Sequence, residues 1–279
     1  MLNIDSLIPN AKIHFIGIGG ISMSGLAQIM HHRGFIVSGS DMKASQVTKH
    51  LESLGITVFY GHHQNHIKED IDYVVYTAAI ADTNPELVAA RAHVKYVFTR
   101  SEFLGFIMKS YKYPVCISGT HGKTTTTSML SHALLSADLD PTITVGGILK
   151  EIGGNIRLGK TDYFITEACE YCDSFLDFFP KVGIILNIEE DHMDYFKDIH
   201  QIRSSFQKFA SKISKDGFLS INGTIDNLDD FLKPVTCQIE TFGLDKNFDW
   251  YADNITFNEK ACAQFDIYYK GEFFSHVSL

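Results

Sequence analysis

Positive charge is scarce in this sequence, which has 24 lysine and arginine residues against 33 aspartate and glutamate residues, a formal net charge of −9. Nucleic-acid-binding domains usually present a basic face, so this balance argues against nucleic acid as a partner. No apolar run approaches the roughly 18 to 20 residues of a membrane-spanning helix, so no membrane segment is expected. Residues 1–10 contain no basic stretch followed by an apolar core, so no signal peptide is predicted.

Cysteines are also few, and the five present are scattered along the chain. An odd number at scattered positions fits the reduced thiols of a cytoplasm better than a disulfide framework. The hydrophobic content of 45% and the charged content of 20% are ordinary for a globular protein. A length of 279 residues is long for one domain. The bulk numbers therefore predict a cytoplasmic protein of two domains.

The first domain opens with a short apolar run at residues 12–16 that leads directly into Gly17-Ile18-Gly19-Gly20. Apolar residues at helical spacing follow over 21–32, and the next predicted strand, 35–41, ends in Asp41. This strand, glycine loop, helix and strand form the opening of a dinucleotide-type fold. The alternation then continues with predicted strands at 56–59, 72–77 and 96–99, and predicted helices at 47–54, 85–92 and 102–109.

The same alternation restarts after the stretch 111–114, which is the predicted boundary between domains 1–111 and 112–279. Further strands are predicted at 115–118, 163–167, 182–187 and 218–222, and helices at 124–137 and 199–214. Apolar strands separated by helices indicate a mainly parallel sheet that is covered on both faces. The tail 250–279 alternates differently and predicts a β-hairpin around Lys270-Gly271.

Residues 119–125 read Gly-Thr-His-Gly-Lys-Thr-Thr between a predicted strand and a predicted helix. Small residues let backbone N–H groups surround phosphate oxygens, and the helix N-terminus adds its positive end. Lys123 would reach the β- and γ-phosphates, and the Thr124 hydroxyl would reach Mg²⁺. Ile117 stands where the full phosphate-loop pattern has its first glycine, so this loop has the shorter form Gly-Thr-x-Gly-Lys-Thr. The predicted ATP-binding residues are Gly119, Thr120, His121, Gly122, Lys123, Thr124 and Thr125.

A nucleotide in such a loop needs a carboxylate that reaches Mg²⁺ from a neighbouring strand end. Glu167, at the end of strand 163–167, is the first candidate. His192 lies in the loop after strand 182–187, at the edge of the sheet where ligands gather. A histidine among acids is, taken alone, more typical of a solvated loop, and so are the acids around it.

Four segments resemble the Mur ligases, the ATP-dependent amide-forming enzymes of peptidoglycan assembly. They are Gly17–Gly25 with Ser38–Asp41, Tyr76–Ile80, Ser118–Thr125 and Asn187–Asp194. The resemblance runs over essentially the whole chain, and the order and spacing of the segments are specific. His121 is typical of the branch that adds L-alanine to UDP-N-acetylmuramate and of the recycling branch, where several other branches have asparagine.

The resemblance implies that Lys123 and its loop bind ATP, and that Glu167 and His192 hold Mg²⁺ together with Thr124. Lys123, Glu167 and His192 are then the catalytic residues. The expected fold is α/β: a Rossmann-like UDP-binding domain followed by a P-loop NTPase-like domain with a mainly parallel sheet. UDP-N-acetylmuramate and L-alanine would be the substrates, with ATP and Mg²⁺ as cofactors.

The residues of the first domain are compatible with two different ligands. Asp41 stands near the position of the ribose-binding acid of NAD enzymes, but Ser22 replaces the third glycine of that fingerprint. The residues alone leave NAD and UDP equally open, and the resemblance favours UDP. The predicted UDP-sugar residues are Gly17, Gly19, Gly20, Ile21, Ser22, Met23, Asp41, Thr77 and Ala78.

The chain departs from the family where Cys169 and Cys172 replace two acids after Glu167. A Cys-x-x-Cys pair could bind metal or cycle between redox states, but no second pair accompanies it, so plain substitution is favoured. His62, His63 and His66 have a metal-like spacing, and here a solvated loop is favoured.

Three alternative functions remain beside the alanine-adding reaction. A recycling ligase would join a whole tripeptide to UDP-N-acetylmuramate, but its loop typically reads Gly-Ile-Cys-Gly where this chain has Gly17-Ile18-Gly19-Gly20. A nicotinamide-dependent oxidoreductase fused to an NTPase lacks an evident acid or base for hydride transfer. A non-catalytic UDP-sugar-binding module also remains, because the C-terminal domain and the His-Asn-x-x-Asn segment of the family do not appear. The chain alone is therefore expected to be inactive in ligation.

Overall fold

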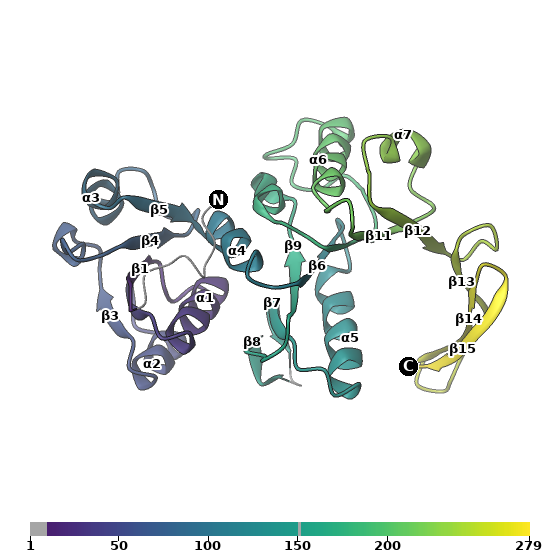
Figure 1. Ribbon diagram of the computed structural model, residues 1–279, viewed down its shortest axis with the longest axis horizontal. Helices are drawn as coiled ribbons and strands as arrows, with labels where there is room; N and C mark the ends of the chain where they lie inside the picture. Colours follow the sequence, from purple (N-terminus) through teal and green to yellow (C-terminus); the bar gives the residue numbers. More distant parts are fainter. Residues whose placement is uncertain (1–9, 150–151) are drawn as a thin grey trace. The chain divides into compact units, whose positions relative to one another are not determined.

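The computed structural model describes residues 10–149 and 152–279 (Figure 1). The chain divides into two compact units: residues up to Pro114 with Thr124–Glu167, and Val115–Lys123 with Ala168–Leu279. The split into domains 1–111 and 112–279 stays a prediction. Over the described residues, no helix has the length and apolar character needed to cross a membrane.

A five-stranded parallel sheet organises the first part of the first unit, in the order β3-β2-β1-β4-β5. Its strands are β1 (Lys12–Ile16), β2 (Ile36–Asp41), β3 (Thr57–Tyr60), β4 (Tyr73–Tyr76) and β5 (Tyr96–Thr99). The chain leaves β1 toward one edge of the sheet and β4 toward the other. The loops after these two strands therefore border the crevice in which α/β sheets bind their ligands. The Rossmann-like prediction is confirmed.

Three helices connect these strands, α1 (Ile21–His32), α2 (Gln46–Ser53) and α3 (Pro85–His93), and α4 (Arg100–Met108) follows β5. The apolar positions of α1 that predicted the helix are all buried, namely Met23, Leu26, Ala27, Ile29 and Met30. Gly34 follows α1 with a φ of +86°, as a glycine C-terminal cap requires. A capping box between Thr99 and Glu102 begins α4 at Arg100, two residues earlier than predicted.

The rest of the first unit consists of most of α5 (Lys123–Ser136) and the strands β7 (Thr142–Leu149), β8 (Gly154–Arg157) and β9 (Tyr163–Ala168). β7 pairs in parallel with β9 and antiparallel with β8. The sequence did not predict β7 or β8. Gly146 and Gly147 interrupt the apolar pattern of β7, and a strand interior rarely carries glycine.

The second unit contains a mainly parallel sheet, as predicted. The strands follow the order β6-β10-β11-β12-β13-β14-β15, parallel up to β13 and antiparallel beyond it. They are β6 (Tyr113–Ser118), β10 (Val182–Ile185), β11 (Phe218–Asn222), β12 (Gln238–Gly243), β13 (Trp250–Phe257), β14 (Ala263–Tyr269) and β15 (Glu272–Ser278), with the helices α6 (Ile199–Ser211) and α7 (Leu228–Leu232). The predicted hairpin turn is confirmed, since Lys270 and Gly271 both have positive φ between β14 and β15. The sequence did not predict β12.

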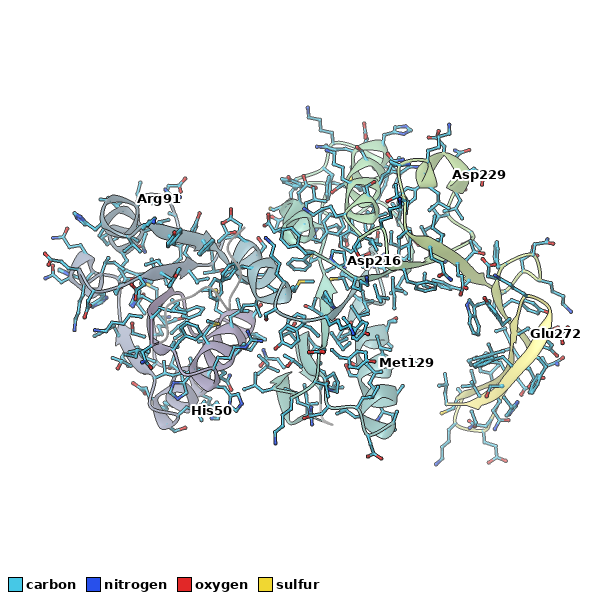
Figure 2. All side chains as sticks on the ribbon, in the orientation of Figure 1. His50, Arg91, Met129, Asp216, Asp229 and Glu272 are labelled. Atoms are coloured by element: carbon cyan, nitrogen blue, oxygen red, sulfur yellow. The ribbon has the colours of Figure 1, made fainter. Side chains whose placement is uncertain are left out.

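Figure 2 draws the side chains of the described residues, including labelled ones on the outside of both units. His50, Arg91, Asp216 and Glu272 are all exposed there.

A buried cluster of polar groups in the first unit overturns one expectation. His62 and His66 do not belong to a solvated loop, because their Nδ1 atoms lie 2.6 and 2.5 Å from the carboxylate of Glu86, which is 0% exposed. His63, between them, is exposed. Burial raises the pKa of Glu86, but hydrogen bonds from His14, Ser40 and His62 outweigh burial and lower this pKa to about 2.

Replacing Glu86 with glutamine is expected to remove a pH-dependent part of the stability. The pKa of Glu86 is 4.5 in the unfolded chain and about 2 when folded, so the contribution is complete above pH 4.5 and is lost as the pH falls toward 2. The difference corresponds to about 3 kcal/mol of unfolding free energy at pH 7. Urea unfolding followed by circular dichroism at several pH values between 7 and 3 measures it.

The exposed Glu52 on α2 provides the control. Glu52→Gln should change the unfolding free energy by less than about 0.5 kcal/mol at every pH. A Glu86→Gln effect that stays constant across the pH range would contradict the ionisation argument.

Candidate active site

The predicted phosphate loop joins β6 to α5, and its backbone needs glycine at two places. Gly119 and Gly122 have φ values of +146° and +83°. A Cβ on Gly119 would lie 2.9 Å from Cβ of Leu186, closer than real Cβ contacts. Glycine at 119 therefore lets the loop turn tightly against the segment that follows β10.

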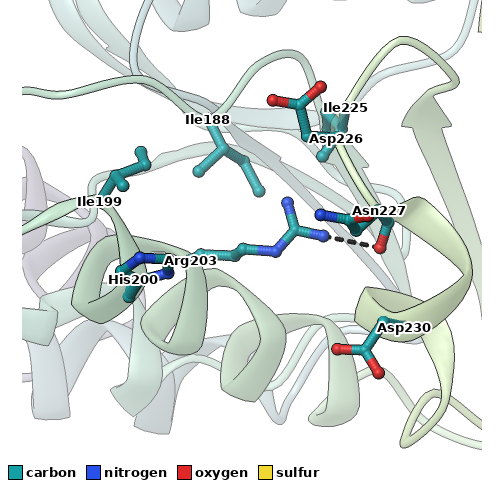
Figure 3. A pocket seen from close by; sticks show the side chains of 8 residues that line it. All are labelled: Ile188, Ile199, His200, Arg203, Ile225, Asp226, Asn227 and Asp230. Atoms are coloured by element: carbon teal, nitrogen blue, oxygen red, sulfur yellow. Dashed lines mark hydrogen bonds between the residues drawn. The ribbon is translucent and has the colours of Figure 1, made fainter.

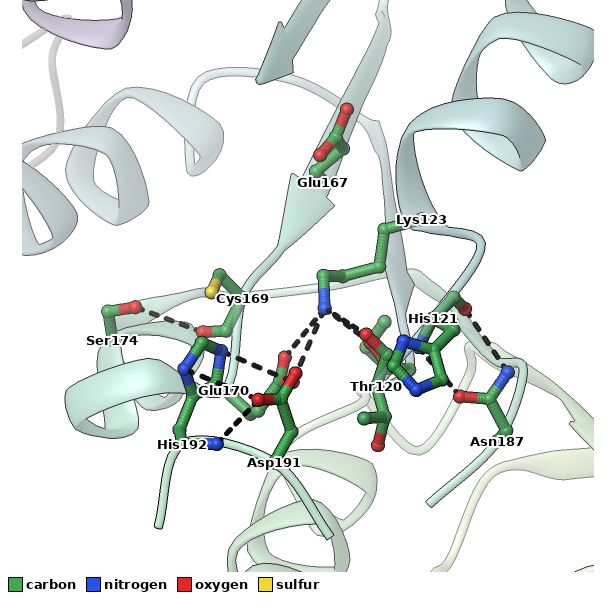
Figure 4. A network of polar contacts seen from close by, with 12 residues as sticks. Thr120, His121, Lys123, Glu167, Cys169, Glu170, Ser174, Asn187, Asp191 and His192 are labelled. Carbon is green, nitrogen blue, oxygen red and sulfur yellow. Dashed lines mark hydrogen bonds and ion pairs between the residues drawn. The ribbon is translucent and has the colours of Figure 1, made fainter. Parts of the chain in front are cut away.

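That segment also fixes the loop by hydrogen bonds (Figure 4). The Asn187 carboxamide accepts from the His121 N–H at 2.8 Å and donates to the His121 carbonyl at 3.1 Å. The Asn187 carbonyl accepts from the Thr120 N–H at 3.2 Å, and the Thr120 hydroxyl accepts from the Glu189 N–H at 2.9 Å. The loop is thus held in place before any ligand binds, which lowers the entropy cost of binding.

Lys123 begins α5 and points back toward Glu170 (Figure 4). Its Nζ donates to both carboxylate oxygens of Glu170, at 3.0 and 3.3 Å, and also to the carbonyls of Gly119 and Thr120. Glu170 is 1% exposed, so this is a buried ion pair. No motif in the sequence indicates a role for Glu170. Its only signal was its position three residues after Glu167.

His192 lies beside the same carboxylate. Its Nε2 is 3.9 Å from Oε1 of Glu170, and its Nδ1 is 3.9 Å from Oδ1 of Asp191. Among the residues that the structure describes, Glu170, Asp191 and His192 form the one group of histidine, cysteine or acidic side chains whose ligand atoms all lie within 4.8 Å. Two carboxylates and an imidazole fit a divalent cation. Neither Cys169 nor Cys172 belongs to this group.

Thr124 and Glu167, the other predicted metal ligands, meet in the first unit. The Thr124 hydroxyl donates to Oε2 of Glu167 at 3.1 Å, and the Gly146 N–H donates to Oε1 at 2.9 Å. A hydroxyl and a carboxylate are oxygen ligands of the kind that Mg²⁺ prefers. Glu167 occurs in β9 as predicted, one residue before the strand ends, and Thr125 is exposed on the first turn of α5.

Two tyrosines extend the polar network around His192. Tyr171 packs its ring 4.7 Å from the His192 ring and donates its hydroxyl to Asp194 at 2.9 Å. The Tyr195 hydroxyl donates to Asp173 at 2.8 Å. Each carboxylate favours the protonated phenol and raises the pKa of its tyrosine to about 12. Both phenols therefore remain neutral hydrogen-bond donors.

The glycine loop of the first unit is held by the end of β2. The Ser40 carbonyl accepts from the N–H groups of Gly17 and Ile18, at 2.8 and 2.9 Å. The Asp41 carboxylate accepts from the Gly19 N–H at 2.8 Å. Three consecutive N–H groups thus face the protein. The backbone groups left for an anion are those of the first turn of α1.

That first turn contains Ile21, Ser22 and Met23. Its N-cap residue Gly20 supplies no side-chain hydrogen bond, so these N–H groups remain available as a helix N-terminus for phosphate. The Met23 side chain is buried and only its backbone faces this end, whereas Ile21 is 48% exposed. Arg100 donates to the Ser22 hydroxyl at 3.1 Å. Arg100 was not among the predicted site residues, although it directly follows the carboxyl end of β5.

Thr77 and Ala78 directly follow β4, the strand next to β1. The Thr77 N–H donates to the Ile16 carbonyl at 3.4 Å, and a Cβ on Gly17 would lie 2.7 Å from Cγ2 of Thr77. Ala78 is exposed. The structure therefore brings the predicted UDP-sugar residues to one end of the parallel sheet.

A separate cavity of about 490 Å³ opens beyond the ends of β10 and β11 (Figure 3). Arg203 crosses it and donates to the Asn227 carbonyl at 2.7 Å. The Arg203 guanidinium also lies over the Phe231 ring, and Asp226 and Asp230 flank it. Because the Arg203 guanidinium already donates to a carbonyl and two carboxylates line the same cavity, the cavity is a poor site for an anion.

Comparison with known families gives two matches that together cover almost the whole chain. The catalytic domain of the Mur ligase family matches residues 12–112, and the Mur ligase middle domain matches residues 117–279. The chain belongs to the Mur ligase family. The resemblance that the four sequence segments indicated is confirmed.

Curated relatives of this Mur ligase chain include two UDP-N-acetylmuramate–L-alanine ligases. The one from Agathobacter rectalis is 54% identical over 265 residues, which cover 95% of this chain and 58% of the relative. The one from Clostridium novyi is 55% identical over 259 residues, covering 93% of this chain and 56% of the relative. The chain thus spans somewhat more than half the length of the curated relatives it matches.

Two solved structures of Mur ligases share this fold. UDP-N-acetylmuramate:L-alanyl-gamma-D-glutamyl-meso-diaminopimelate ligase from Neisseria meningitides matches with a TM-score of 0.84 and 29% identity, covering 96% of this chain and 86% of that chain. UDP-N-acetylmuramate-alanine ligase from Thermotoga maritima matches with a TM-score of 0.78 and 28% identity, covering 96% and 60%.

Replacing Lys123 with methionine should destabilise the protein, because Glu170 then becomes an unpaired buried carboxylate. Breaking a buried ion pair in this way costs about 3–5 kcal/mol. Adding Glu170→Gln to the same chain should recover most of that loss, since no buried charge remains. Urea unfolding of the single and double variants at pH 7 measures both effects.

Lys181→Met is the matched control, because Lys181 pairs with Asp216, whose side chain is 82% exposed. Removing this surface pair should cost less than about 1 kcal/mol. If Lys123→Met costs no more than Lys181→Met, the pair of Lys123 with Glu170 does not stabilise the protein as a buried ion pair.

Proposed function

We propose that this chain binds UDP-N-acetylmuramate and MgATP, and that it acts in the ligation of L-alanine to the lactyl carboxylate of UDP-N-acetylmuramate during peptidoglycan precursor synthesis in the cytoplasm. The observation that supports this most is the 54% identity with a UDP-N-acetylmuramate–L-alanine ligase over 95% of the chain. The geometry agrees with it, because each unit presents a backbone loop suited to phosphate.

The proposed reaction has two steps. A lactyl carboxylate oxygen attacks the γ-phosphorus of ATP, and the bond from that phosphorus to the bridging oxygen breaks. ADP leaves, and the product is an acyl phosphate. The amine of L-alanine then attacks the acyl carbonyl, the bond to the phosphate oxygen breaks, and inorganic phosphate leaves as the amine loses a proton. Phosphorylation is needed because a free carboxylate has no adequate leaving group.

Lys123 is proposed to bind the phosphoryl group that is transferred. It would exchange its contacts with Glu170 and the loop carbonyls for phosphate oxygens, as the lysine of a phosphate loop does. Thr124 and Glu167 in the first unit and His192 in the second are each proposed as Mg²⁺ ligands, and Mg²⁺ would neutralise charge on the β- and γ-phosphates when bound. Glu170 and Asp191 are further candidate ligands through their contacts with His192.

A recycling ligase is the second candidate, since the solved structure with a TM-score of 0.84 is named as the ligase of UDP-N-acetylmuramate and a tripeptide. Its identity to this chain is only 29%, and Gly17-Ile18-Gly19-Gly20 lacks the cysteine typical of that branch. Stabilisation of the chain against heat by the tripeptide and not by L-alanine, with UDP-N-acetylmuramate and MgATP present, would favour this candidate. A nicotinamide enzyme is disfavoured, because both halves of the chain match Mur ligase domains.

UDP-N-acetylmuramate and MgATP should each raise the melting temperature of the chain, and NADH should not. A ligand that binds only the folded state at about 100 times its Kd adds about 2.7 kcal/mol of stability. Thermal unfolding with each ligand separately measures the shifts. Stabilisation by NADH without any by UDP-N-acetylmuramate would reject the proposal in favour of an oxidoreductase.

Two variants should separate the two nucleotide sites. Gly19→Ala places a Cβ 2.7 Å from Oδ2 of Asp41 and should abolish the shift with UDP-N-acetylmuramate while keeping the shift with MgATP. The double variant Lys123→Met with Glu170→Gln should show the reverse pattern. Loss of both shifts in both variants, with the fold intact, would argue against two independent sites.

A further inference from the structure

The buried carboxylate of Glu86 lies beneath the glycine loop of the first unit and joins four segments of the chain. Its Oε2 contacts the Ser40 hydroxyl and, at 2.6 Å, Nδ1 of His62. Its Oε1 lies 2.5 Å from Nδ1 of His66 and 3.5 Å from Nε2 of His14. These partners come from β2, the loop after β3, the short helix η2 (Gln64–His66) and β1.

Helix α3 explains why an ionised group is tolerated here. Glu86 lies in its first turn, after the N-cap Asn84 and Pro85. A carboxylate near a helix N-terminus is favoured by the helix dipole. A carboxylate also only accepts hydrogen bonds, so Nδ1 of His62 and Nδ1 of His66 must both carry a proton to approach it this closely.

Ser40 links this cluster to the glycine loop. Its hydroxyl contacts Glu86, and its carbonyl accepts from the N–H groups of Gly17 and Ile18. The next residue, Asp41, holds the N–H of Gly19. Ser40 is itself 0% exposed, so water does not replace either contact. The position of three loop N–H groups thus follows the position of the end of β2.

We propose that Glu86 is a positioning residue for nucleotide-sugar binding, which acts through Ser40 to hold the glycine loop in its binding geometry. This inference rests on the proposed UDP-N-acetylmuramate site. Glu86 does not contact the ligand. It fixes the strand end that orients residues 17–19 and hence the first turn of α1.

A shared metal ion is a poorer explanation of the cluster. Among the described residues, the one group whose ligand atoms come within 4.8 Å of one another is Glu170, Asp191 and His192. The Nδ1 atoms of His62 and His66 therefore serve Glu86 as hydrogen-bond donors, and Nε2 of His14 lies 3.5 Å from its Oε1. Glutamine at this position keeps the shape but replaces one acceptor oxygen with a donor NH₂ group, which then faces Ser40 and His62 or His66 and His14.

Glu86→Gln, Ser40→Ala and the double variant test the inference in a thermodynamic cycle. Calorimetric titration measures the Kd for UDP-N-acetylmuramate at pH 7. Each single variant should weaken binding about tenfold, and the double variant should be no weaker than about twentyfold. Two residues that act through one link are not additive, whereas independent structural roles would give about a hundredfold loss.

Amide hydrogen exchange without ligand provides a second readout that does not depend on the proposed function. The N–H groups of Gly17 and Ile18 should exchange faster in both single variants, because the Ser40 carbonyl that protects them is less fixed. Val94→Ala, a core change in the same unit at the end of α3, is the control. It should lower the melting temperature while leaving loop exchange and Kd close to wild type.

Unchanged exchange at Gly17 and Ile18 in Ser40→Ala and Glu86→Gln would overturn the inference, as would an additive double variant. If Glu86→Gln does not fold, exchange in Ser40→Ala still decides the question. If wild type does not bind UDP-N-acetylmuramate, the proposed function fails, and faster loop exchange would still support the link from Glu86 to the loop.

Discussion

Hydrogen bonds between a loop and the end of the neighbouring parallel strand determine the geometry of both candidate phosphate sites. In the first unit, Ser40 and Asp41 hold the N–H groups of residues 17–19. In the second, Asn187 and the N–H of Glu189 hold Thr120 and His121. Glycine-rich backbone can adopt many conformations, so it binds an anion well only when neighbouring groups fix one of them.

Charged side chains also contact both loops in the absence of a ligand. Lys123 pairs with the buried Glu170, and the Asp41 carboxylate occupies an N–H group of the glycine loop. Each contact gives a hydrogen-bond partner to a polar group that would otherwise have none. A nucleotide that binds must replace these contacts with its own. Its affinity therefore depends on the difference in free energy between its contacts and those that it replaces.

Much of the architecture was predictable because it follows local rules. The buried stripe of α1, the glycine after it and the Lys270-Gly271 turn each depend on neighbouring residues only. The strands β7, β8 and β12 were missed because glycines, short length or polar residues hide them, and pairing with neighbouring strands stabilises them. The solvated loop expected at His62 and His66 was wrong for the same reason, since their partner Glu86 is at least 20 residues away.

The sequence by itself determined the family and the order of most strands and helices, and it predicted the two phosphate loops, because these depend on motifs and on periodicity along the chain. It could not determine the roles of Glu170, Arg100 and Glu86. Each acts through contacts between residues far apart in the sequence, such as Lys123 with Glu170, Ser22 with Arg100 and Ser40 with Glu86. A buried charge is stabilised only by its partners in space, and the tertiary structure alone decides which those are.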